Sequence, residues 1–149
     1  DAVVSPDPEG TAMGAAPVEE IAESVGQGKQ IVLIDHEDSF VHTLGNYLRQ
    51  TGANVRTLRA GPSALTTIQS MIDNGKKPDM VVLSPGPGTP SDFNLSGSLE
   101  FMEKNKIPGF GVCLGLQGMV EYFGGVLGTI RSYDIEPRLV GKLMRRSSK

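Results

Sequence analysis

The sequence predicts an α/β domain with an open, mostly parallel β-sheet and helices on both faces. Short apolar runs rich in Val, Ile and Leu alternate with segments whose apolar residues recur at helical spacing. This alternation is typical of βαβ units, whose crossover helices lie on the faces of a parallel sheet. Two glycine-rich breaks, at 85–90 and around Cys113, directly follow predicted strands. Because ligands bind beyond the carboxyl ends of such strands, we expect both breaks at a functional edge.

The first two elements are a strand and a helix. QIVLID (30–35) is a short apolar run that ends at an acid, as in a strand buried on both faces. A helix follows over 38–52. Asp38 or Ser39 caps its start and Gly52 ends it. Its apolar residues at helical spacing are Phe40, Leu44, Tyr47 and Leu48.

The remaining elements continue the alternation. The expected strands are NVRTLRA (54–60), DMVVLS (79–84), IPGFGVC (107–113) and VLGTI (126–130). The expected helices are PSALTTIQSMIDNG (62–75), SLEFMEKNK (98–106) and LGLQGMVEYFGG (114–125). In the first of these helices, the apolar stripe consists of Leu65, Ile68, Met71 and Ile72.

Composition excludes several classes of protein. Of the 149 residues, 38% are hydrophobic and 21% charged, which fits a globular domain. The net charge of −3 offers no basic face, so we expect no nucleic-acid partner. No apolar run approaches the roughly 20 residues of a membrane span, so we expect no membrane association. The single cysteine excludes an internal disulfide and suits a reducing compartment, and we expect a cytoplasmic location. We find no cluster of metal ligands and expect no metal or cofactor in this domain.

We expect three segments along the chain. Residues 1–29 are rich in Pro, Gly, Ala and acids and read as a flexible linker, with one helical turn over 19–25. The folded domain covers 30–130, and 131–149 form a divergent tail with a basic, solvated end. Because the chain begins with Asp1 rather than Met, we expect either a processed product or a piece of a longer protein.

The stretch GVCLG (111–115) matches the nucleophile-elbow pattern with cysteine in the serine position. A strand that turns sharply into a helix holds its turn residue in a strained conformation, so small residues are needed two positions away on each side. The turn residue then projects above the sheet at the helix N-terminus, where the dipole and free amides favour a thiolate and stabilise an oxyanion. The alternative is a buried cysteine packed as a small hydrophobe.

LSPGPGTP (83–90) follows the third predicted strand. Its prolines fix φ, whereas Gly86 and Gly88 let the backbone approach a ligand closely. The result is a stiff ribbon of N–H groups that suits an oxyanion hole, and the alternative is a turn without a ligand.

Three blocks in this order resemble class I (triad-type) glutamine amidotransferases, and most of all the amidotransferase domain of anthranilate synthase. They are VLIDHEDSFVHTLGNYLRQTGA, VVLSPGPGTPSD and GVCLGLQGMVEYFGG, within residues 30–130. The resemblance implies a flavodoxin-like fold and a join to a chorismate-using synthase in the same chain or in a partner subunit. That partner uses Mg²⁺, whereas the amidotransferase domain needs no cofactor.

The resemblance also implies roles for individual residues. Cys113 attacks the side-chain amide of glutamine, giving a γ-glutamyl thioester and ammonia. The backbone amides of Gly86 and Leu114 form the oxyanion hole, and Gly88 lines the glutamine site. Gln117, one helical turn after the cysteine, holds the substrate. Its alternative is an ordinary exposed helix residue.

The family's catalytic base has no counterpart in this sequence. The family supplies a histidine backed by a glutamate near the end of the domain, whereas the histidines here are His36 and His42, both upstream of Cys113. Family members often carry Asn at the position of His36. Neither histidine matches the base, so we expect a C-terminally incomplete amidotransferase that is inactive alone, with an uncovered sheet edge that promotes association.

Three alternatives remain open at this point. Amidotransferases of aminodeoxychorismate and phenazine synthesis share these motifs. A non-catalytic module that binds glutamine or docks to a partner needs no base. The third alternative is an unrelated cysteine hydrolase on an α/β scaffold.

Overall fold

The computed structural model describes residues 25–128 and confirms the predicted α/β class. Within these residues, one sheet of four parallel strands has the order β2-β1-β3-β4. The strands are β1 (Gln30–Asp35), β2 (Asn54–Arg59), β3 (Met80–Leu83) and β4 (Gly109–Gly111). The helices are α2 (Val41–Gln50), α3 (Pro62–Asp73), α4 (Leu95–Lys104), α5 (Leu114–Tyr122) and the short 3₁₀ helix η1 (Pro90–Phe93).

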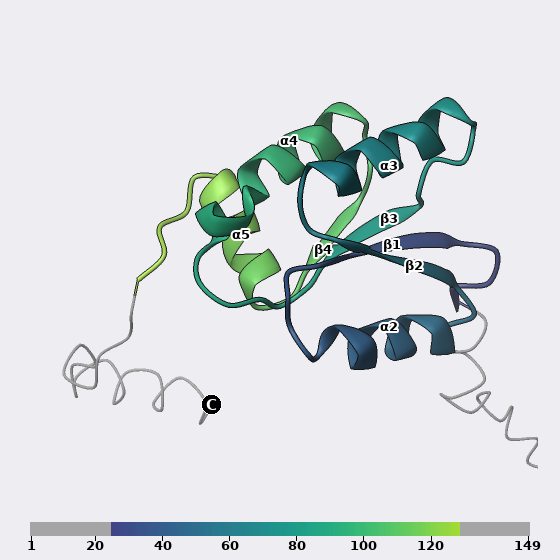
Figure 1. Ribbon diagram of the computed structural model, residues 1–149, viewed down its shortest axis with the longest axis horizontal. Coiled ribbons are helices and arrows are strands. Elements are labelled where there is room, and N and C mark those ends of the chain that lie inside the picture. Colours follow the sequence, from purple (N-terminus) through teal and green to yellow (C-terminus); the bar gives the residue numbers. More distant parts are fainter. Residues whose placement is uncertain (1–24, 129–149) are drawn as a thin grey trace, which may run out of the picture.

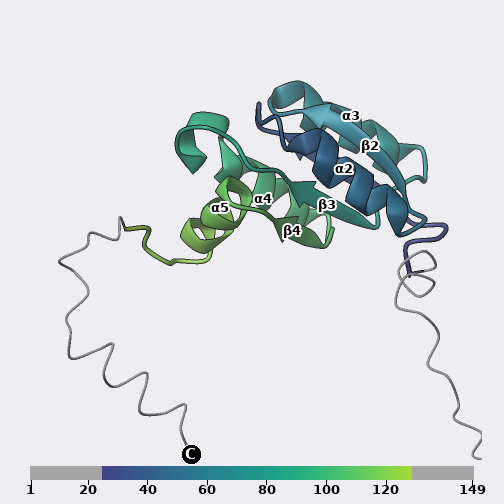
Figure 2. The same cartoon turned by 90° about the horizontal axis from the view of Figure 1, so that it is seen from below.

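Helices cover both faces of the sheet, as the sequence predicts. Figure 1 shows α2 on one face and α3 and α4 on the other. The alternating side chains of β1 enter both layers: Val32 and Ile34 pack with α3 and α4, whereas Ile31 and Leu33 pack with α2. In the view of Figure 2, α2 and α3 again lie on opposite sides of β2, and α5 lies beside α4. β1 is therefore buried on both faces.

From β1 the chain first adds β2 on one side of the strand and then β3 and β4 on the other, so β1 and β3 are parallel neighbours at a topological switch point. In parallel sheets the crevice at such a switch point is the usual ligand site. The segments that follow β1, β3 and β4 all leave from this carboxyl edge. They are the turn 36–40, the Pro-Gly ribbon 84–90 and the elbow 112–113.

Helix α2 differs from the expected helix in which side chains it buries. Val41, Leu44 and Gly45 are buried, whereas Phe40 and Tyr47 are 43% and 57% exposed. Phe40 precedes the helix, so its side chain does not follow the inward stripe. The expected cap is wrong, because the N-cap is Phe40 and no side chain caps the helix; Asp38 Oδ1 instead accepts a hydrogen bond from the Phe40 amide at 2.7 Å. At the other end Gly52 follows the helix with φ of +85°, as expected.

β4 (Gly109–Gly111) is shorter at both ends than the expected strand 107–113, and the start of α4 and the last expected strand also differ. α4 begins at Leu95 rather than Ser98, because the buried Leu95 extends its apolar face by one turn. The strand expected over 126–130 does not form in its described part, 126–128, where Val126 is 92% exposed and has no strand beside it.

The expected outer segments stay predictions. The description begins at Val25, so the linker 1–29 and the helical turn 19–25 lie almost wholly outside the described residues. The tail 131–149 lies entirely outside them.

Candidate active site

Cys113 occupies a sharp turn between β4 and α5. Its backbone has φ of +49° and ψ of −106°, a conformation that L-residues rarely adopt. The Val112 amide still bonds the Leu83 carbonyl at 3.0 Å, so the strand pairing continues to the residue before the turn. Helix α5 begins at the residue after it, and the side chain is exposed rather than packed in the core. The alternative of a buried, inert cysteine is therefore wrong.

The glycines on either side of Cys113 are sterically required. A Cβ added at Gly111 would lie 2.5 Å from the carbonyl carbon of Gly115. A Cβ added at Gly115 would lie 2.3 Å from the carbonyl oxygen of Leu83 on β3. All these contacts are with backbone atoms, which cannot move aside as a flexible side chain can. The two glycines let α5 start directly against the end of β3.

The Pro-Gly ribbon brings Gly86 next to the elbow. A Cβ added at Gly86 would lie 2.7 Å from Cδ2 of Leu114, the first residue of α5. Within residues 25–128, no hydrogen bond of the protein occupies the amide of Gly86 or that of Leu114. Among the described residues, two amides without a hydrogen-bond partner therefore lie in adjoining segments, and donors of this kind form oxyanion holes.

Gly88 has φ of +76° and turns the ribbon into η1. Asp92 closes this turn: its Oδ2 accepts hydrogen bonds from the Thr89 amide at 2.7 Å and the Thr89 hydroxyl at 2.8 Å. These bonds, that from the amide first, lower the pKa of Asp92 below its ordinary value. A Cβ at Gly88 would lie 2.5 Å from the same carboxylate oxygen. The Thr-x-x-Asp spacing is a capping-box signal, but the sequence reading did not use it.

His36 lies under the ribbon, buried and 1% exposed. Its amide donates to Ser84 Oγ at 2.9 Å, and its Nδ1 lies 3.1 Å from the Ser84 carbonyl oxygen. Burial lowers the pKa of His36, against the opposing effects of the Ser84 carbonyl and of the Asp35 charge. The ring also meets Phe93 edge to face, with 5.3 Å between centroids. The neutral, enclosed imidazole is thus part of the architecture of the site.

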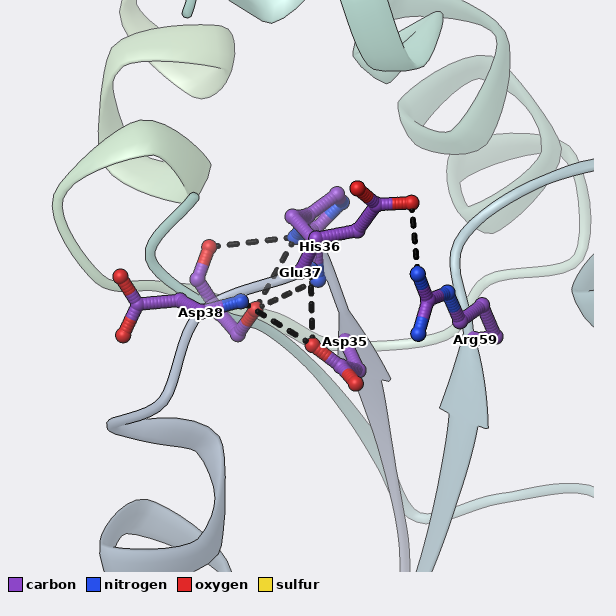
Figure 3. Close-up of polar contacts among 6 residues, drawn as sticks. Asp35, His36, Glu37, Asp38 and Arg59 are labelled. Carbon is purple, nitrogen blue, oxygen red and sulfur yellow. Dashed lines mark hydrogen bonds and ion pairs between the residues drawn. The ribbon is translucent and has the colours of Figure 1, made fainter. Parts of the chain in front are cut away.

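The turn after β1 is shaped by its own acids. Asp35 Oδ1 accepts from the amides of Glu37 at 2.8 Å and Asp38 at 3.4 Å, and Figure 3 shows the carboxylate aimed at both. Glu37 has φ of +66°, and its carboxylate pairs with Arg59 of β2 at 2.8 Å on the exposed surface. This turn fixes the backbone from which His36 enters the core.

Gln117 and His42 are both exposed helix residues. The Gln117 amide bonds the Cys113 carbonyl at 2.9 Å, so the side chain starts one turn beyond the cysteine. His42 lies on α2, on the face of the sheet opposite α4. Within residues 25–128 neither histidine forms a hydrogen bond with Cys113, and Nδ1 of His36 faces Ser84 instead.

A metal-binding cluster and a membrane-spanning helix are both absent from the part of the chain that the structure describes. No group of three or more His, Cys, Asp or Glu side chains there could hold a metal ion. Nor is any helix between residues 25 and 128 long and apolar enough to cross a membrane.

A parallel α/β sheet with a cysteine at a strand-to-helix elbow defines the structural class, and comparison with known sequences identifies the family. Residues 32–147 match the family described as "Glutamine amidotransferase class-I". The chain belongs to this family, which confirms the resemblance predicted from its three sequence blocks.

Its relatives include anthranilate synthase proteins. The chain is 51% identical over 121 residues to an "Anthranilate synthase" of Azospirillum brasilense, covering 81% of this chain and 16% of that protein. It is 45% identical over 98 residues to a "Multifunctional tryptophan biosynthesis protein" of Pichia angusta, covering 65% and 25%. It is 40% identical over 97 residues to an "Anthranilate synthase component 2" of Vibrio parahaemolyticus, covering 65% and 48%. The chain thus spans from about one sixth to about half of these relatives' lengths.

Proposed function

We propose that this chain is the glutamine-binding, nucleophile-bearing part of an anthranilate synthase, which releases ammonia from glutamine to convert chorismate into anthranilate. The observation that carries the proposal is the exposed Cys113 at its elbow, near the amides of Gly86 and Leu114, which bond no other group between residues 25 and 128. The names of these relatives favour anthranilate synthesis over aminodeoxychorismate or phenazine synthesis.

In the proposed reaction the Cys113 thiolate attacks the side-chain amide carbon of glutamine. The carbonyl oxygen becomes an oxyanion, which the Gly86 and Leu114 amides stabilise. Collapse breaks the C–N bond and releases ammonia, which takes up a proton supplied by the general acid, and leaves a γ-glutamyl thioester. Water then cleaves the thioester to glutamate and restores the thiol. Gly88 lines the site and Gln117 reaches toward the bound substrate.

The base of this reaction lies outside residues 25–128. His36 is buried against Ser84 and His42 is on another face of the sheet. We therefore propose that the proton of Cys113 is taken by a group contributed from elsewhere in the working enzyme. The partner is a chorismate-using synthase, fused or separate, that binds Mg²⁺, and the assembly works in the cytoplasm.

A chloroketone analogue of glutamine tests the proposal. The Cys113 sulfur displaces chloride and forms a stable thioether, whose mass is read on the intact protein. At pH 9 thiols ionise without a base, so we expect one adduct on the chain, slowed by free glutamine and absent in Cys113→Ser. The matched control His42→Asn should be labelled at the normal rate. Labelling that glutamine does not slow would refute the proposal.

A second candidate is a non-catalytic module that binds glutamine, favoured because no base contacts Cys113 within residues 25–128. Glutamate release distinguishes the two, measured for the chain alone and with a chorismate-using synthase subunit. Glutamate release that depends on Cys113 in either sample would exclude the non-catalytic module. Glutamine-protected labelling of Cys113 without glutamate release in either sample would favour it.

A further inference from the structure

We propose that His36 is a positioning residue that holds the Pro-Gly ribbon, so that the Gly86 amide faces the reaction centre at Cys113. The inference rests on the proposed function, because it assigns His36 a role in that same site. The sequence reading left His36 without a role, since it does not match the family's base.

The hydrogen bonds around Ser84 fix which His36 nitrogen carries the proton. Ser84 Oγ donates its single hydrogen to the Pro85 carbonyl at 2.7 Å and accepts from the His36 amide at 2.9 Å. His36 Nδ1 lies 3.1 Å from the Ser84 carbonyl oxygen, which only accepts, and 3.2 Å from Oγ, whose hydrogen is already used. Nδ1 therefore carries a proton and donates it to the start of the ribbon.

His36 also packs directly against Gly86. A Cβ added at Gly86 would lie 2.6 Å from both Cβ and the carbonyl oxygen of His36, and 2.7 Å from Cδ2 of Leu114. Gly86 is thus enclosed between the histidine and the first residue of α5. Phe93 meets the imidazole ring edge to face at 83°, which fixes its orientation. A displacement of His36 therefore moves one of the two proposed oxyanion donors relative to the other.

Two substitutions test the hydrogen-bond donor of His36 and its aromatic ring separately. Asn has an N–H₂ group attached to Cγ, at the same number of bonds from Cα as Nδ1, so His36→Asn keeps a donor for the Ser84 carbonyl but loses the ring. His36→Phe keeps a ring against Phe93 but has no donor. A role in packing alone predicts that Phe is the better substitute, whereas the positioning role predicts that Asn is.

The measurement is a ratio of two labelling rates at Cys113. In both reagents the Cys113 sulfur displaces the halide directly, but only the chloroketone is held in the proposed glutamine site, where its carbonyl oxygen accepts hydrogen bonds from the Gly86 and Leu114 amides. Dividing the first rate by the second removes changes in thiol exposure or ionisation, and a thermal melt verifies that each variant folds. We expect His36→Phe to lower the ratio about tenfold, because it displaces a donor to the bound carbonyl, and loss of one such hydrogen bond weakens binding by about an order of magnitude. We expect His36→Asn to stay within about threefold of wild type, and the exposed-site control His42→Phe to leave the ratio unchanged.

The outcomes separate this inference from the function on which it rests. If wild type shows no labelling that glutamine slows, the proposed function fails. If wild type is labelled selectively and His36→Phe keeps the wild-type ratio, the positioning role alone is refuted. A lower ratio for Asn than for Phe would also overturn it, because the ring rather than the donor would then matter.

Discussion

Replacing Gly115 by Ala places one methyl group against the centre of the elbow. The new Cβ would lie 2.3 Å from the carbonyl oxygen and 2.6 Å from Cβ of Leu83, a fully buried residue of β3. Neither the strand nor the first turn of α5 can shift without breaking the Val112–Leu83 hydrogen bond at 3.0 Å. Overpacking a rigid site costs about 1–3 kcal/mol, and contact with backbone atoms favours the upper end of this range.

The assay is thermal unfolding followed by circular dichroism, with the labelling rate of Cys113 measured in parallel. For a domain of this size, about 2–3 kcal/mol lowers Tm by roughly 10–20 °C. Gly128→Ala is the matched control, because its Cβ would meet nothing within 4 Å, and it should leave Tm unchanged. A Gly115→Ala protein that melts within 2 °C of wild type would refute the reasoning that α5 is seated directly on β3.

Three further predictions concern other parts of the molecule. Burial holds the pKa of His36 below its ordinary value, so the unfolded chain binds the proton more tightly than the folded chain. The stability present above about pH 6.5 is therefore lost as pH falls through the folded-state pKa. His36→Asn removes this titration, so its Tm should fall less between pH 7 and pH 5 than that of wild type. Asp35 is the charged group that acts on this ring, whereas Gly86 and Phe93, which pack against it, carry no charge. An equal fall of Tm with pH in wild type and His36→Asn would contradict the lowered pKa of His36. Within residues 25–128, β4 is an edge strand whose Phe110 is 54% exposed, so sedimentation velocity should show concentration-dependent association that Phe110→Lys reduces. Sedimentation of both proteins as monomers would contradict this prediction. The Arg59–Glu37 pair is exposed, so Arg59→Ala should change the free energy of unfolding by less than about 1 kcal/mol, and a larger loss in urea unfolding would show that the pair matters.

The sequence was sufficient for the sheet and for the elbow because their signals are local. Short apolar runs bounded by turns identify strands buried on both faces, and the elbow requires small residues at fixed spacing around Cys113. The structure shows the steric reason at Gly111 and Gly115, whose added Cβ atoms would enter backbone. The predicted class of protein and its fold are confirmed, whereas the catalytic and binding roles stay predictions.

What the sequence could not provide depends on contacts between distant segments. The role proposed for His36 needs Ser84, which lies 48 residues away along the chain, and no periodicity joins the two. The burial of α2 is a second case, because helical spacing alone does not tell which of two neighbouring stripes faces the sheet. Tyr47 fits the helical period but is exposed, whereas Gly45, which has no apolar side chain to signal burial, is buried against the sheet.

The central claim is that Cys113 lies within a glutamine site. The most direct test is the protection of Cys113 from the chloroketone by free amino acids, with the modified residue located by peptide mass mapping. We predict that glutamine slows modification of Cys113 in a saturable way and that asparagine, one methylene shorter, protects far less. Equal protection by both amino acids, or none by either, would contradict the assignment.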